Sequence, residues 1–78
     1  MSLRAAALRT ALERALDDPV HVLSTERGIR IHAPAPAPAD VARWEQVYGA
    51  LRTADAWGSA YTPMGPEVWA LIQDEVTA

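Results

Sequence analysis

The sequence predicts an α+β fold in which a helix, a hairpin, a second helix and a second hairpin follow one another, with the two helices on one face of a small antiparallel sheet. Apolar residues recur with helical spacing in residues 3–17 and 39–54, and apolar side chains alternate with others in residues 20–33. A Thr-Pro-Met-Gly turn joins two runs rich in strand-forming residues, 57–62 and 67–72.

The first helix is predicted over residues 3–17. Its apolar side chains share one stripe, and its arginines and glutamate lie off that stripe. The stripe consists of Leu8, Ala11, Leu12, Ala15 and Leu16. The sequence Asp17-Asp18-Pro19 is predicted to end the helix, because the residue before a proline avoids helical dihedral angles.

The first hairpin is predicted to have an apolar inner face. Val20 and Val22 share one face of the first strand, and Ile29 and Ile31 share one face of the second. An even-numbered loop around residues 25–28 keeps these aliphatic side chains on the same side of the sheet, whereas an odd loop would need a bulge.

The same register places His21 directly opposite His32 on the outer side of the hairpin. A zinc site needs three or four ligands, and the sequence implies no third ligand beside these histidines. We therefore expect no metal site here, and we expect no bound cofactor.

The stretch HAPAPAPAD, residues 32–40, is predicted to be a stiff, extended proline–alanine connector that leads into the second helix, residues 39–54. The apolar stripe of this helix consists of Val41, Trp44, Val47, Tyr48 and Leu51. We expect Trp44 to be buried between helix and sheet, and Gly49 to allow close packing against the sheet.

The second hairpin is predicted with a four-residue loop, residues 63–66. Trp57, Tyr61, Val68 and Ile72 then face the core. Trp69 faces the other way beside Leu71, above the small residues Gly58 and Ala60, and Leu23 of the first hairpin joins this outer surface.

Two alternatives remain open for the C-terminal part of the chain. With the opposite parity, Val68 and Ile72 would lie on the outside instead. Residues 66–76 could also form a helix, because Pro66 suits a first helical position and Val68, Ile72 and Val76 have helical spacing.

Length and composition restrict the class of protein. The 78 residues suffice for one small domain, residues 1–78, and the absence of cysteine leaves oligomerisation as the available reinforcement. The net charge of −3 and the scattered arginines argue against nucleic-acid binding. The N-terminal segment is an amphipathic helix rather than a signal peptide, and no segment is apolar enough to span a membrane, so we expect a cytoplasmic protein.

The sequence carries no recognisable catalytic motif. Ser24 and Ser59 lie outside any Gly-x-Ser-x-Gly pattern, and there is no glycine-rich phosphate loop. A domain this thin rarely provides a deep cleft. We therefore expect no enzymatic activity and no small-molecule substrate.

The stretch GIRIHAP, followed after prolines by ADVARWEQVYGALRTAD, resembles the β-hairpin docking domains of nonribosomal peptide synthetases over residues 3–54. That resemblance implies that a peptide of an upstream subunit is received as an added strand. It implies an acceptor edge at Gly28, Ile29, Arg30, Ile31 and His32. The chain departs from the family pattern, because it has Asp17-Asp18-Pro19 instead of a glycine, lacks a lysine-rich second helix and adds a second hairpin.

The C-terminal part, ADAWGS to VWALI, resembles the endings of short uncharacterised actinobacterial proteins, a resemblance that implies no function. Considered together, the residues favour a small protein–protein interaction module that binds a protein or peptide, with self-association expected. We expect Trp69, Leu71 and Leu23 to contact the partner, because tryptophan is enriched at interface hot spots. The alternative is a winged-helix-like DNA-binding regulator of a mobile element, for which Arg43 and Arg52 of the second helix would remain available.

Overall fold

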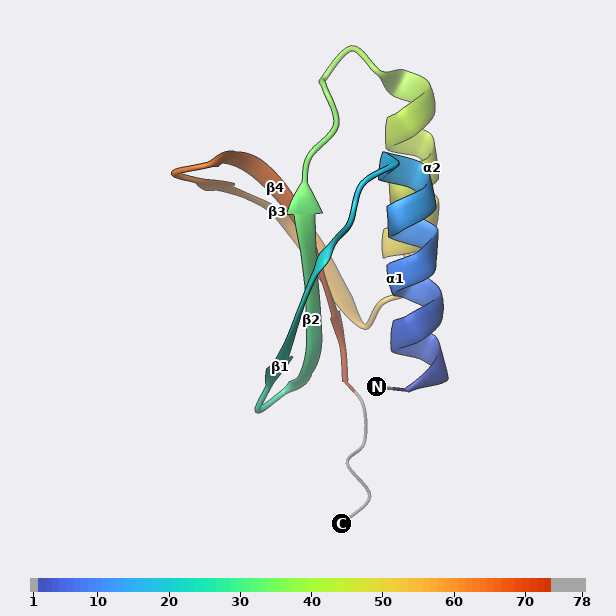
Figure 1. The fold of residues 1–78 in the computed structure, drawn as a ribbon, viewed down its shortest axis with the longest axis vertical. Helices are drawn as coiled ribbons and strands as arrows, with labels where there is room; N and C mark the ends of the chain where they lie inside the picture. Colours follow the sequence, from blue (N-terminus) through green and yellow to red (C-terminus); the bar gives the residue numbers. More distant parts are fainter. Residues whose placement is uncertain (1, 74–78) are drawn as a thin grey trace.

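The computed structural model describes residues 2–73 of the chain. Its elements follow in the order α1 (Leu3–Leu16), β1 (His21–Thr25), β2 (Gly28–Pro34), α2 (Val41–Leu51), β3 (Ala56–Thr62) and β4 (Gly65–Ile72) (Figure 1). The fold class is α+β, as the sequence predicts. Residues 66–72 belong to a strand, so the alternative C-terminal helix is wrong for that stretch, and residues 74–76 lie outside the described part of the chain.

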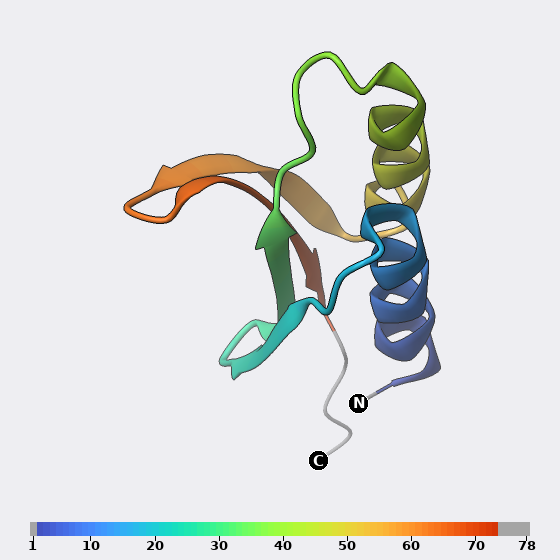
Figure 2. The same cartoon turned by 45° about the horizontal axis from the view of Figure 1, so that its top comes forward.

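The four strands form one antiparallel sheet in the order β1-β2-β4-β3. β2 and β4 are therefore the central strands, and β1 and β3 are the edges. Figures 1 and 2 show α1 and α2 together on one side of this sheet, running in opposite directions. No helix or strand within residues 2–73 covers the opposite side, which we call the outer face.

The core lies between the helices and the inner face of the sheet. Helical spacing brings Leu12 of α1 and Val47 of α2 to this layer, and period-two alternation brings Ile31 of β2 and Val68 of β4. These side chains are almost completely buried. The remaining buried apolar residues are Ala5, Leu8, Ala15, Leu16, Val20, Ala33, Ala50, Leu51, Ala70 and Ile72.

Each helix begins at a residue that caps its free N–H groups. The Ser2 hydroxyl accepts a hydrogen bond from the Ala5 N–H, and the Asp40 carboxylate accepts one from the Arg43 N–H. The first helix ends at Asp17, which adopts a left-handed conformation with φ of 52°. The predicted stop before Pro19 is therefore confirmed to within one residue.

Both hairpins use the same tight turn, in which a threonine pairs with a glycine across a two-residue loop. The hydroxyl oxygen of Thr25 accepts a hydrogen bond from the Arg27 N–H and donates one to the Gly28 carbonyl. Thr62 makes the same bonds with the Met64 N–H and the Gly65 carbonyl. Both glycines have positive φ, 135° and 115°, which favours glycine over other residues.

The first hairpin has the register that the sequence predicts, with His21 opposite His32. The second hairpin does not have the predicted four-residue loop. Thr62 pairs with Gly65, so the loop is Pro63-Met64 alone and every cross-strand pair is shifted by two residues. A shift of two residues preserves which face each side chain occupies, so the predicted faces of β3 and β4 are correct.

The two helix–hairpin units are related by an approximate twofold axis normal to the sheet. Thr62 and Gly65 repeat Thr25 and Gly28 at a constant sequence interval. His32 and Trp69 are separated by that same interval, and they pair directly across the central strands. A twofold axis through this pair accounts for the strand order, for the antiparallel central strands and for both helices lying on one face.

An ion pair fastens the start of α1 to the start of β3. Arg4 donates to both carboxylate oxygens of Asp55, at 3.0 and 3.3 Å, and also to the carbonyl of Thr53 at 3.2 Å. The Gln73 N–H donates to Asp55 Oδ2 at 2.7 Å. The Arg4 guanidinium, followed by the Gln73 N–H, lowers the pKa of the Asp55 carboxyl below its ordinary value.

Two expectations for α2 are wrong. Trp44 is half-buried rather than enclosed between helix and sheet, because it packs only against the margin of the core and its indole N–H bonds to the connector. Gly49 does not approach the sheet. No heavy atom lies within 4 Å of a Cβ placed on it, because it faces solvent at the groove between the helices.

Candidate functional site

The outer face of the sheet is built from alternate residues of all four strands. Cross-strand partners share a face, so the register defines rows of side chains across the sheet. One row contains Leu23, Arg30, Leu71 and Ala56, and the next contains His21, His32, Trp69 and Gly58. Val68, Ala70 and Ile72 are buried on the inner face, which confirms the predicted parity of β4 and excludes the opposite one.

Trp69 lies half-buried near the centre of the outer face, on a central strand. Its ring rests over Gly58, where an added Cβ would lie only 3.1 Å from the ring carbon Cζ2. The guanidinium of Arg30 stands 4.9 Å from the ring centroid, which is a cation–π contact. The sequence predicted the space above Gly58. It could also have indicated the arginine contact, because Arg30 is the diagonal neighbour of Trp69 in this register.

A hollow of about 480 Å³ lies beside Trp69, next to the β1–β2 turn. Its lining combines an aromatic ring, the aliphatic Leu71 and the charged Glu26, Arg27 and Arg30. Thr25 and Ala56 complete it. Leu23, in the same row as Arg30 and Leu71, is 51% exposed. The surface therefore offers apolar contact area with charged groups at one end.

The two histidines stack on the outer face, with ring centroids 5.3 Å apart. His32 Nδ1 is buried, makes no hydrogen bond, and lies 3.6 Å from a carboxylate oxygen of Glu67. No group of three or more histidine, cysteine, aspartate or glutamate side chains within residues 2–73 is placed to hold a metal ion. His21 and His32 thus contribute aromatic and polar area to the surface.

The structure corrects the acceptor edge that the docking-domain resemblance implies. β2 is paired with β1 on one side and with β4 on the other, so residues 28–32 offer no free backbone edge. Ile31 is completely buried, and Ile29 packs against the core from the same face. Gly28 is itself buried at the start of β2, which leaves the side chains of Arg30 and His32 on the outer face.

The predicted core role of Trp57 and Tyr61 is wrong. Both side chains are on the inner side of β3, but Trp57 is 41% exposed and Tyr61 is 90% exposed. β3 is the outermost strand, and the end of the β3–β4 hairpin projects away from the helices in both views (Figures 1 and 2). Nothing in a local sequence pattern indicates that the helices stop short of this hairpin.

An exposed aromatic row follows from this arrangement, and no local pattern in the sequence predicts it. Trp44 stacks on Tyr48 with centroids 5.2 Å apart, and Tyr48 meets Trp57 edge-on at 5.7 Å. Tyr48 is 38% exposed, and Val41, which lines the same surface hollow, is 64% exposed. The row leads from α2 to the free edge of the sheet at β3.

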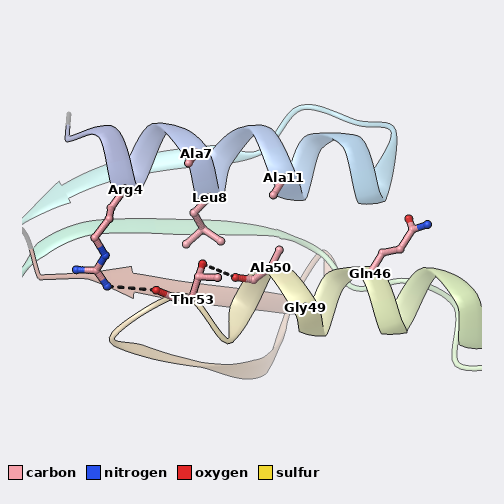
Figure 3. A pocket seen from close by; sticks show the side chains of 8 residues that line it. All are labelled: Arg4, Ala7, Leu8, Ala11, Gln46, Gly49, Ala50 and Thr53. Carbon is pink, nitrogen blue, oxygen red and sulfur yellow. Dashed lines mark hydrogen bonds between the residues drawn. The ribbon is translucent and has the colours of Figure 1, made fainter.

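A shallow groove of about 400 Å³ separates the two helices on the side away from the sheet. Figure 3 shows small side chains of both helices around it, including Ala7, Ala11 and Ala50, with Arg4 and Gln46 toward its ends. Arg4 is engaged with the Thr53 carbonyl, and the Thr53 hydroxyl donates to the Ala50 carbonyl. The lining of the groove contains no aromatic side chain, and its charged residue, Arg4, is paired with Asp55.

Comparisons with protein-family models, with curated proteins and with solved structures each found no match. Within residues 2–73, neither helix has the length and apolar character needed to cross a membrane. The function of the chain is therefore inferred from the chemistry of the surfaces described above.

Proposed function

We propose that this chain is a small protein–protein interaction module of the cytoplasm, which binds a protein partner through the outer face and an edge of its sheet. The supporting observation is that the outer face carries Trp69, Leu71 and Leu23 in adjacent rows, while both helices pack on the other side. A large, rigid aromatic ring on a central strand is a typical interface anchor.

The surroundings of Trp69 support this function. The ring is already positioned by Gly58 below it and by Arg30 beside it, so little conformational entropy is lost when a partner covers it. The hollow next to the ring is lined by both cationic and anionic residues, which can orient a partner segment. These features suit binding of a protein segment better than chemistry on a small molecule.

The DNA-binding alternative gains no support from the structure. Arg43 donates to the Leu16 carbonyl at 2.9 Å and pairs with Asp40 at 3.3 Å, so its guanidinium is used to fasten α2 to α1. Retention on a heparin column at low salt would favour this alternative. We expect the protein to pass through such a column without retention.

In-cell photo-crosslinking tests the proposed function. A photoreactive residue at Leu23 on the outer face should give one discrete adduct, whereas the same residue at Ala7, an exposed position of α1, should give none. Trp69→Ser should abolish the Leu23 adduct and leave the helical circular dichroism signal intact. Equal adducts at both positions, or an adduct unaffected by Trp69→Ser, would contradict the proposal.

A further inference from the structure

We propose that two copies of this chain pair through their β3 strands, edge to edge and antiparallel, with Ser59 of each copy opposite Ser59 of the other. This inference rests on the proposed interaction function and deepens it, because it names a second copy as the occupant of one edge. β3 is an edge strand of seven residues without a charge or a proline. Edge strands that remain unpaired are usually short, charged, proline-containing or covered.

The hydrogen-bond pattern shows which main-chain groups of β3 are available. The Ala35 N–H donates to the Pro66 carbonyl at 3.0 Å, in register with the β2–β4 ladder. Hydrogen-bonded pairs alternate along an antiparallel ladder, so even-numbered residues of β4 bond to β2 and odd-numbered ones bond to β3. By the same alternation, Trp57, Ser59 and Tyr61 direct their N–H and C=O groups toward the free edge.

One register satisfies all of these edge groups. In an antiparallel pair about a twofold axis at Ser59, Ser59 meets itself and Trp57 meets Tyr61 of the second copy. Each of these is a hydrogen-bonded pair, so the free groups of all three residues find partners. A register centred on Trp57 or on Tyr61 would leave edge groups unpaired.

The side chains fit the same register. Trp57 and Tyr61 both lie on the inner side of β3 and remain 41% and 90% exposed, so the dimer would form two cross-strand aromatic pairs. On the outer side, the small residues Gly58 and Ala60 would face each other without collision. Since β3 carries no charge, pairing brings no like charges together along the strand.

The exposed parts of these rings supply on the order of 500 Å² of apolar area, if a tryptophan or tyrosine buries about 200 Å². Specific interfaces bury about 1,200–2,000 Å² in total, and smaller ones belong to weak or transient complexes. We therefore expect a reversible dimer whose population rises with protein concentration.

The other edge is less suited to pairing. β1 has five residues, and the alternation leaves only Val22 and Ser24 with main-chain groups directed outward. The chain itself shows that its hairpins join edge to edge, because β2 and β4 make such an antiparallel contact at the centre of the sheet. The β3 contact would repeat that arrangement between two copies.

Light scattering on the full chain, over a wide range of concentrations, tests this inference with paired variants. Ser59→Pro removes an edge-facing N–H, a position where proline is tolerated, and Ser24→Pro makes the matching change on β1. Tyr61→Lys places a charge in the expected interface. Met64→Lys is its control, because it places the same charge in the turn at a side chain that is 93% exposed, compared with 90% for Tyr61. The wild-type mass should rise toward twice 8.5 kDa. Ser59→Pro and Tyr61→Lys should remain monomeric, while both controls dimerise.

Cysteine substitution provides a geometric readout that does not depend on tolerance of proline. The chain has no cysteine, and a hydrogen-bonded pair separates its Cα atoms by about 5.5 Å, within disulfide range. Ser59→Cys should therefore oxidise to a covalent dimer, and Ser24→Cys should not.

A wild-type chain that stays monomeric at all concentrations, or a dimer unaffected by Tyr61→Lys, would overturn the inference. A dimer lost in Trp69→Ser but retained in Ser59→Pro would do so as well, because the contact would then belong to the outer face. In that case the proposed function would stand. If photo-crosslinking at Leu23 gives no adduct while the dimer centred on Ser59 still forms, the proposed binding function of the outer face is contradicted and the edge-to-edge dimer is not.

Discussion

The indole N–H of Trp44 donates a hydrogen bond to the carbonyl oxygen of Ala37 at 3.1 Å, which joins α2 to the proline–alanine connector. The connector makes no helix or strand of its own after Pro34, and its path is held by this bond and by the bond from the Ala35 N–H to the Pro66 carbonyl at 3.0 Å. Trp44 therefore positions a crossover segment, and it is a smaller part of the core than its place in the apolar stripe predicts.

We expect Trp44→Phe to destabilise the fold by about 0.5–1.5 kcal/mol, because one hydrogen bond is lost while most of the ring contact is kept. Urea denaturation followed by circular dichroism measures the change, and Tyr48→Phe, which keeps the stacked pair, serves as the control. A loss above about 3 kcal/mol, the range for removing a buried aromatic side chain, would show that Trp44 is a core residue after all.

Gly49→Ala should stabilise the protein by roughly 0.5–1 kcal/mol. Glycine in a helix interior is disfavoured relative to alanine by about that amount, and no heavy atom lies within 4 Å of the added methyl group. The measurement is a thermal or urea unfolding midpoint. A lower midpoint would mean that the groove between the helices closes further than the structure shows.

Gly28→Ala should act in the opposite direction. Gly28 has φ of 135°, and its Cβ would collide with the main-chain carbonyl of Ile72 in the neighbouring strand. We expect a loss of roughly 1–3 kcal/mol, the range for a residue forced into such a conformation. Gly65→Ala separates the two causes, because Gly65 has φ of 115° but open space around it and should lose less stability. Equal losses would mean that backbone strain alone decides the effect.

The Arg4–Asp55 ion pair should make folding stability dependent on acid pH. Because the pKa of Asp55 is lowered in the folded state, its carboxylate stabilises the fold above the ordinary aspartate pKa. That contribution is lost as the pH falls below the ordinary value toward the lowered one. Asp55→Asn should reduce stability at neutral pH, and its difference from the wild type should shrink in acid. Asp18→Asn makes the same charge change on an exposed residue after α1 and serves as the control for the loss of charge alone.

Local patterns were sufficient to predict the faces of the strands. The alternation of aliphatic residues, together with an even-numbered loop, requires that His21 pair with His32 across the first hairpin. The same alternation places Trp69 and Val68 on opposite faces of the sheet. These properties depend only on a few neighbouring residues. The two-residue error in the second loop left the faces unchanged for the same reason.

The identity of the edges could not be predicted, because strand order depends on contacts between distant segments. The sequence gives no local sign that β2 pairs with β4, and so the resemblance alone placed an acceptor edge on a strand that is central. Similarly, periodicity shows that Trp57 and Tyr61 face the helix side but not whether a helix reaches them. The sequence therefore predicts the candidate surface on the outer face, but it does not predict the exposed aromatic row that leads to the free edge at β3.

The matching turns lead to a prediction about additivity. Thr25→Val and Thr62→Val each remove a hydroxyl that makes two hydrogen bonds with the main chain, one part-buried and one exposed. We expect each change to destabilise the fold by about 1 kcal/mol. The two turns lie at separate ends of the sheet in both views (Figures 1 and 2), so the double variant should lose the sum of the single losses. Thr53→Val, which removes a hydroxyl bonded to the Ala50 carbonyl at the end of α2, is the control outside the hairpins. Denaturation curves of the single and double variants measure these losses of stability. A double variant that loses clearly more than the sum would show that the two hairpins stabilise each other through β2 and β4.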